Sequence, residues 1–197
     1  MRKFCMLCTS AVLITAALAG TAAAEGLRGR LAATGRLGIT NPAESEKNSD
    51  AGRLVVPTDA GIIGGGGFMF GVDETIAVEL NLTRSTYHTS GFGRADVTNL
   101  SIGAQYRFPE RQRLVPYWGG GVDVLINDLS QGYANTTIGA HLSGGVDYVV
   151  NRQVALNAEL KGVESFSADV EAGNGTKLGK FDPSSLSLTF GVRFFIN

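Results

Sequence analysis

The chain has 197 residues, a length typical of one domain, with 44% hydrophobic residues, 18% charged residues and a formal net charge of −1. The low share of charge and the 27 glycines argue against a disordered, highly charged tail. The near-neutral charge argues against nucleic acid as a partner, because nucleic-acid-binding proteins carry a clustered basic excess.

The first 24 residues have the features of a secretory signal peptide. Two basic residues precede an apolar stretch, residues 4–20, and three alanines shortly after it provide a cleavage pattern. The alternative is a transmembrane anchor, but the stretch is short and no stop-transfer pattern follows it. We therefore predict cleavage between Ala24 and Glu25. This divides the chain into a signal peptide, residues 1–24, and a mature domain, residues 25–197, that contains neither cysteine.

The mature domain repeats an alternation of apolar and polar residues with a period of two. From Ile76 to Leu82 every second residue is a large aliphatic one, and Glu79 and Asn81 stand among the residues between them. This period is that of a β-strand with one apolar and one polar face. Residues 60–72 follow it less clearly, because four consecutive glycines interrupt them. The eight predicted strands comprise residues 27–40, 60–72, 76–83, 98–108, 117–127, 138–148, 154–161 and 186–196.

Two kinds of fold could use such strands, which are about ten residues long and so can cross a bilayer at a tilt. In a soluble sandwich the apolar faces point inward, whereas in a membrane barrel they point outward into lipid. The export signal and the aromatic residues near strand ends, such as Trp118 and Phe108, favour the barrel.

Connector lengths also favour the barrel. Long or polar connectors (residues 41–59, 88–95, 128–136 and 164–184) alternate with shorter ones (residues 73–75, 109–116 and 150–153). Short turns at one rim and long loops at the other are typical of outer-membrane proteins. The sequence therefore predicts an all-β protein of the cell outer membrane, an eight-stranded antiparallel up-and-down transmembrane β-barrel. Both termini of the mature domain are expected on the periplasmic, short-turn side.

The same alternation assigns a set of polar side chains to the inside of the barrel. The expected lumen-lining residues are Arg28, Arg30, Arg36, Glu79, Arg107, Asp123, His141, Asp147, Glu159, Lys161 and Arg193. Eight strands enclose an interior only about wide enough for side chains or one small ligand. Two interpretations stay open. The charges pair with one another as a polar plug, or they form a narrow conduit or the polar floor of a ligand pocket.

The sequence offers few candidates for catalysis or for metal binding. A serine and histidine pair near His88 lacks an evident third group that would orient the base, and His141 stands on the polar face of a strand. The mature domain shows no spacing typical of zinc or calcium sites. The glycines at 64–67 and 119–121 match no phosphate-binding motif and suit the curvature of barrel strands. We therefore expect no catalytic residues, no metal and no cofactor, and a protein that is not an enzyme.

Several short segments resemble the outer-membrane protein W family. They are residues 87–88 (YH), 116–122 (PYWGGGV), 145–152 (GVDYVVNR), 155–158 (ALNA), 182–183 (DP) and 191–194 (GVRF). Their order and spacing extend over the whole mature domain. The resemblance implies an eight-stranded barrel with a narrow, partly apolar interior proposed to admit small hydrophobic molecules. The broader group of small opacity-type and OmpA-like barrels is the alternative.

Three functions follow as hypotheses. The favoured one, which rests on the resemblance, is a narrow passive channel for small hydrophobic solutes. The alternative is a structural or interaction barrel whose extracellular loops bind partners without transport. A lipid-modifying enzyme is a third hypothesis, and it requires His88 or His141 to be essential. The expected partners are outer-membrane lipid, the outer-membrane assembly machinery and small hydrophobic solutes.

Overall fold

The computed structural model describes residues 26–49, 52–90, 93–109, 113–130, 132–171 and 177–196. The predicted signal peptide and its cleavage site between Ala24 and Glu25 lie outside the described residues. Within the described ranges, no helix is long and apolar enough to cross a membrane.

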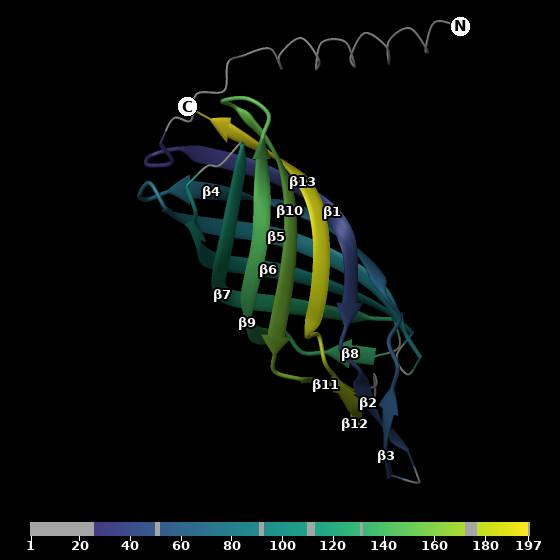
Figure 1. Ribbon diagram of the computed structural model, residues 1–197. Helices are drawn as coiled ribbons and strands as arrows, with labels where there is room; N and C mark the ends of the chain where they lie inside the picture. Colours follow the sequence, from purple (N-terminus) through teal and green to yellow (C-terminus); the bar gives the residue numbers. More distant parts are fainter. Residues whose placement is uncertain are drawn as a thin grey trace, which may run out of the picture.

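Eight antiparallel strands close into a barrel (Figure 1). They are β1 (Leu31–Pro42), β4 (Gly61–Gly71), β5 (Ile76–Thr89), β6 (Gly93–Arg107), β7 (Leu114–Leu129), β9 (Thr137–Val149), β10 (Val154–Ser165) and β13 (Ser185–Ile196). Each strand pairs with the next in this series, and β1 pairs with β13 along its whole length, which closes the ring. Closure supplies a backbone partner to strand edges that hydrocarbon could not satisfy. The predicted eight-stranded up-and-down barrel is confirmed.

The apolar face of the spanning strands points out of the barrel, as the alternation predicts. On β5, Leu80 and Leu82 are 48% and 54% exposed, whereas Asn81 between them is 8% exposed. Similar exposed rows continue around the ring, for example at Ile102 on β6 and Phe190 on β13. Soluble proteins rarely expose apolar patches that continue over so much of their surface, and a bilayer buries such patches in its acyl chains.

Five short strands extend the sheet beyond the barrel rim, at the end away from the start of β1 and the end of β13 (lower part of Figure 1). They are β2 (Ser45–Ser49), β3 (Gly52–Val56), β8 (Gly132–Ala134), β11 (Ala168–Glu171) and β12 (Lys177–Phe181). β8 pairs with the end of β7, and β11, β12, β2 and β3 follow in that order. The sequence predicts only connectors here, because stretches of three to five residues are too short to show a period.

The first strand begins four residues later than predicted. Residues 27–30 form a turn, in which Gly29 has a φ of 77° and donates its N–H to the Gly71 carbonyl at 2.7 Å. The N–H of Arg30 donates to the Leu27 carbonyl at 3.1 Å and completes the turn. Glycine tolerates this left-handed backbone, so the alternation of residues 27–30 does not continue as a strand. Arg28 is exposed on the turn, and its prediction as a lumen-lining residue is wrong.

Three layers of side chains fill the interior. The loop-end cluster is apolar and consists of Tyr87, Ala95, Val97, Leu125, Leu129, Val163, Ala168, Val170 and Phe181. A smaller apolar cluster at the other end contains Ala32, Met69 and Ala77. Polar and charged side chains lie between the two clusters, and they form the candidate functional site.

Candidate functional site

The charged layer of the lumen is built from inward-facing positions of seven of the eight barrel strands. It consists of Arg36, Glu79, Arg107, Asp123, Asp147, Glu159, Lys161 and Arg193. Because inward and outward positions alternate on every strand, the period that exposes the aliphatic rows also places these side chains inside. Four cations therefore face four anions in a region that is shielded from water.

Arg193 lies at the centre of this layer and is completely buried. Its Nη1 donates to Asp147, its Nη2 donates to Glu79 Oε1 at 3.0 Å, and its Nε donates to Thr34 Oγ1 at 3.1 Å. A buried guanidinium is stable only when its charge and its donors are matched in this way. The Arg193 side chain thereby ties β13 to β1, β5 and β9 across the lumen.

A second arginine shares the Asp147 carboxylate. Arg107 Nη2 donates to Asp147 Oδ2, and Arg107 Nη1 donates to Gln105 Oε1 at 3.1 Å. The other carboxylate oxygen, Asp147 Oδ1, accepts from Asn157 Nδ2 at 2.7 Å. Two guanidiniums and one amide therefore surround this fully buried carboxylate, which offsets the cost of removing it from water.

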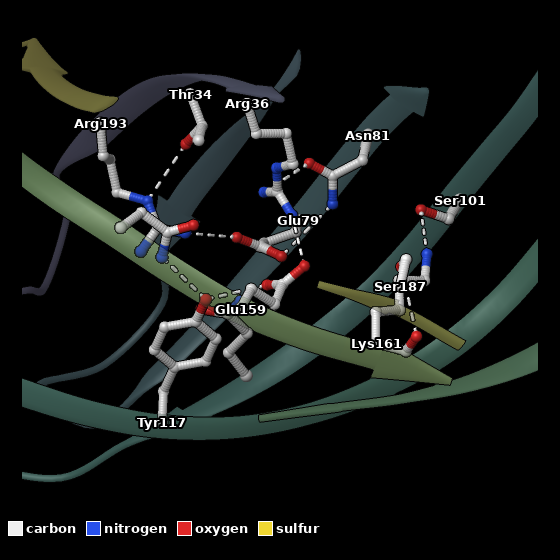
Figure 2. A network of polar contacts seen from close by, with 12 residues as sticks. Thr34, Arg36, Glu79, Asn81, Ser101, Tyr117, Glu159, Lys161, Ser187 and Arg193 are labelled. Carbon is white, nitrogen blue, oxygen red and sulfur yellow. Dashed lines mark hydrogen bonds and ion pairs between the residues drawn. The ribbon is translucent and has the colours of Figure 1, made fainter. Parts of the chain in front are cut away.

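A further ion pair of the layer joins Arg36 to Glu159 (Figure 2). Glu159 Oε2 also accepts from the Tyr117 hydroxyl at 2.9 Å, and that hydroxyl accepts from Asn157 Nδ2 at 2.8 Å. Arg36 Nη2 reaches Asn81 Oδ1 at 3.2 Å. The amides and the phenol thus connect the ion pairs into one network that extends across the barrel.

A third group of contacts surrounds Asp123. Its Oδ1 accepts from Lys161 Nζ at 3.0 Å and from Asn99 Nδ2 at 2.8 Å, and its Oδ2 lies 2.5 Å from His141 Nδ1. Lys161 Nζ also donates to Ser101 Oγ at 3.2 Å. Figure 2 shows these two side chains pointing toward one another. This serine, aspartate, lysine and histidine are buried or largely buried in the lumen, where their contacts hold the wall together.

Two glycines make room for the rings in this layer. A Cβ on Gly145 would lie 2.4 Å from the Tyr117 hydroxyl, and a Cβ on Gly121 would lie 2.8 Å from His141 Cε1. Neither distance is compatible with a side chain, so each ring occupies space that only glycine leaves open. Gly121 and Gly145 therefore serve the packing of the lumen.

The charged layer leaves little free volume. A cavity of about 30 Å³ lies beside Arg36, Asn81 and Lys161, which is room for about one or two water molecules. A hydrophobic solute moving along the barrel axis would have to displace paired charges, at a desolvation cost of several kcal/mol per ion. In the described residues, the arrangement corresponds to the polar plug rather than to an open conduit.

The structure brings most of the predicted lumen residues together. Arg36, Glu79, Arg107, Asp123, Asp147, Glu159 and Arg193 are buried, and His141 and Lys161 are largely buried beside Asp123. Arg30 lies apart at the short-connector mouth, where its guanidinium packs 4.3 Å from the centre of the Phe195 ring. Sequence reasoning missed the uncharged partners, above all Asn157 and the Tyr117 hydroxyl. Both residues stand at inward-facing positions of their strands, and this alternation is the sequence feature that could have identified them.

The two histidines lie on opposite faces of the wall. His141 points inward to Asp123, whereas His88 is exposed near the loop end of β5. They therefore do not form one site. Within the described parts of the chain, no group of three histidine, cysteine, aspartate or glutamate side chains is placed to hold a metal ion.

A groove of about 630 Å³ lies in the wall towards the long-connector end, where β9, β10, β13 and β1 stand side by side. This wall groove is lined by residues 41–43, 140–142, 162–164 and 184–186. Its lining includes exposed residues of the outer face, Leu142 and Leu186, and Val163 of the loop-end cluster. The wall groove thus brings the lipid-facing surface next to the apolar part of the interior.

Comparisons with known proteins agree with this architecture. The sequence profile of the family described as outer membrane protein beta-barrel domain matches residues 9–194. No curated protein has a significantly similar sequence. Among solved structures, the crystal structure of OprG from Pseudomonas aeruginosa is similar with a TM-score of 0.67 and 18% identity, over 87% of this chain and 98% of that chain.

Two further structures were determined by NMR. AlkL in DMPC lipid bilayers has a TM-score of 0.60 and 16% identity, over 89% of this chain and 93% of that chain. The outer membrane protein W of E. coli has a TM-score of 0.51 and 18% identity, over 86% of this chain and 98% of that chain. At these identities the similarity shows the fold alone. The resemblance to the outer-membrane protein W family is thereby confirmed at the level of the fold.

Proposed function

Because this chain belongs to the outer membrane protein beta-barrel domain family, we propose that it is a passive route by which small hydrophobic solutes enter the outer membrane. The protein is an outer-membrane β-barrel, and lipid surrounds its exposed aliphatic rows. The solute class is the one that the resemblance to the outer-membrane protein W family implies. The outer-membrane assembly machinery is part of this proposal, as the partner that inserts the barrel.

The observation that carries the proposal is the contact between the loop-end cluster and the wall groove. Leu125, Val163 and Phe181 fill the interior at the long-connector end with buried apolar side chains. Val163 also lines the wall groove, beside the outward-facing Leu142 and Leu186. An apolar solute gains free energy in the wall groove, because the groove removes it from water and the side chains behind it are apolar.

The charged layer determines the direction of the proposed route. Below the loop-end cluster, the ion pairs Arg193–Asp147 and Arg36–Glu159 cross the lumen. An apolar solute gains nothing from these groups and would break their pairing, so we propose that it leaves through the wall groove into the bilayer. On this route the barrel lowers the free-energy barrier that an apolar solute meets when it crosses the membrane surface. The route needs no open pore along the barrel axis.

A matched pair of glycine substitutions tests this function. Gly162 lines the wall groove, and a Cβ there would meet only Leu186 Cδ1, at 3.9 Å. Gly144 lies on the same outer surface, has similar space and does not line the groove. We expect Gly162→Leu to fill the groove and to slow the uptake of a labelled alkane into cells or vesicles that carry the barrel. Gly144→Leu should leave uptake at the wild-type rate.

Two results would contradict the proposal. The first is an uptake rate for the wild-type barrel no higher than that of membranes without it. The second is equal uptake by the Gly162→Leu and Gly144→Leu variants, which would show that the groove is not on the route.

A second function, binding of a partner without transport, is favoured by the strands beyond the rim. This extension exposes large apolar side chains, with Leu54 55% and Val55 62% exposed on β3 and Phe166 78% exposed before β11. Exposed apolar residues that lie above the bilayer are typical of interaction surfaces. If this is the function, replacing Leu54 and Val55 by serine should abolish partner binding, and the wild-type barrel should show no alkane uptake. The transport proposal expects alkane uptake that these two substitutions leave unchanged.

A further inference from the structure

The wall groove is polar at one end and apolar at the other. β10 runs towards the long-connector rim, so Glu164 lies nearer to that rim than Gly162. Gly162 pairs with Leu142 of β9 and with Leu186 of β13, and both leucines are exposed on the outer face. Ser184, one residue before β13, continues this register beside Glu164. An elongated molecule in the wall groove would therefore meet polar groups at the rim and apolar side chains deeper in the membrane.

The charge of the wall groove is negative. Among the described residues that line it, Glu164 and His141 are the only titratable ones. His141 points into the lumen, where its Nδ1 lies 2.5 Å from Asp123 Oδ2, whereas Glu164 is exposed. No described residue forms an ion pair with the Glu164 carboxylate. Lys161, the cation of β10, points into the lumen and pairs with Asp123. The wall groove thus presents one carboxylate whose charge is not offset by a neighbour in the described structure.

This carboxylate lies at the boundary between water and hydrocarbon. A charge there attracts a cation more strongly than it would in bulk water, because the adjoining hydrocarbon has a low dielectric constant. An ion pair that stays in contact with water still changes affinity only a few-fold. Apolar burial supplies the larger part of the binding free energy, and the groove volume of about 630 Å³ is within the range of small-molecule sites.

From this arrangement we infer that the wall groove selects small apolar amines, with the ammonium group beside Glu164 and the apolar body against Leu142 and Leu186. Primary alkylamines are, like the lysine side chain, cations near neutral pH. The amine comes from the medium, because the polar end of the groove faces the long-connector rim, which is the extracellular side in outer-membrane proteins. The inference rests on the proposed function, since it names the solute class that the wall groove prefers and makes Glu164 the residue that determines this preference.

Hexylamine, hexanol and hexanoate provide the test, because they share one apolar body and differ in charge. Each is titrated into the protein in phosphatidylcholine nanodiscs, and the methyl NMR signals of Leu142 and Leu186 report occupancy of the wall groove. The methyl signals of Leu80, on the outer face of β5, report partitioning into the bilayer. We expect saturable shifts at the two groove leucines. Hexylamine should bind about threefold more tightly than hexanol, and hexanoate about threefold more weakly.

Substitutions of Glu164 test its role directly. Glu164→Gln keeps the shape of the side chain and removes its charge, so the three probes should bind with equal affinity. Glu164→Lys should reverse the order, so that hexanoate binds most tightly. The control Asp128→Asn removes an exposed carboxylate of β7 near the same rim, outside the wall groove, and should keep the wild-type order. Gel mobility before and after boiling checks that every variant is folded.

Four results would overturn the inference: equal affinities of the three probes for the wild type, an unchanged order in Glu164→Gln, loss of the order in Asp128→Asn, or shifts at Leu80 that match those at the groove leucines. None of these changes the outcome of the alkane-uptake test with Gly162→Leu, which concerns the proposed function. Absence of alkane uptake together with the expected order of binding would overturn the transport route alone.

Discussion

Arg193 of β13 and Asp147 of β9 form a fully buried ion pair across the lumen, although β10 lies between their strands in the wall. The contact crosses the interior of the barrel, so it links two strands that do not pair in the wall. Arg107 reaches the same carboxylate from β6. Asp147 is therefore the residue on which the pairing of two cations depends.

Removing the charge of this residue should weaken the barrel strongly. In Asp147→Asn, Arg193 retains Glu79 but Arg107 loses its anion, and a buried charge without a partner typically costs about 3–5 kcal/mol. We expect the free energy of unfolding, measured by urea titration in lipid vesicles, to fall by that amount. The control Asp128→Asn changes an exposed carboxylate on β7 and should have little effect. Equal stability of the two variants would show that the pair contributes nothing.

The close approach of Tyr117 to Gly145 leads to a second prediction. In Gly145→Ala the new methyl group would overlap the phenol and would also lie 2.5 Å from the Ala158 carbonyl oxygen. We expect a loss of about 1–3 kcal/mol in the free energy of unfolding, as for other overpacked interiors. The adjacent Gly144→Ala adds a methyl group on the outer face, with its nearest neighbour at 3.9 Å. If both variants are equally stable, the tyrosine does not occupy this position.

The depth of an outward-facing residue in the bilayer should determine the cost of charging it. Leu80 lies near the middle of β5 and Ile76 at its short-connector end, both on the outer face. We expect Leu80→Arg to cost about 2–4 kcal/mol in unfolding free energy and Ile76→Arg about 0–1 kcal/mol. Urea unfolding in vesicles measures both values. Similar costs at the two positions would mean that this face does not cross a membrane.

The filled lumen predicts the electrical behaviour of the barrel. Because paired charges occupy the axis, the wild-type protein should give no steady ion conductance in planar bilayers. Removing both members of a pair, in Arg36→Ala with Glu159→Ala, leaves no unpaired charge and widens the space next to the cavity of about 30 Å³. We expect a measurable conductance from this double variant. Stable open steps from the wild type would show that the charged layer does not seal the lumen.

The alternation of residue types predicted the strands, and the export signal, the aromatic residues near strand ends and the connector lengths favoured a barrel over a sandwich. A period of two depends only on the geometry of a strand, so the eight spanning strands and the outward direction of residues such as Leu80 could be predicted from the sequence. The predicted strand from residue 27 began too early, because Gly29 satisfies the alternation but adopts a turn. The turn depends on a backbone contact with Gly71, which no local pattern encodes.

The composition of the lumen was predictable, but its pairing was not. The alternation along each strand places Asp147, Glu159 and Arg193 inside the barrel. It does not indicate which cation pairs with which anion. Arg193 and Asp147 are 46 residues apart, and their contact depends on the stagger and the closure of the barrel. The strands beyond the rim were missed because three to five residues are too few to show a period, and only β8 pairs with a barrel strand, β7.

The most direct test of the central claim, a closed barrel with its aliphatic rows in lipid, is electrophoretic mobility before and after boiling. Small closed barrels resist unfolding by detergent until they are heated. We expect membrane-extracted protein to migrate as a compact species when unboiled and to shift on boiling. A single unchanged mobility, with the protein recovered from the periplasm without detergent, would contradict the account.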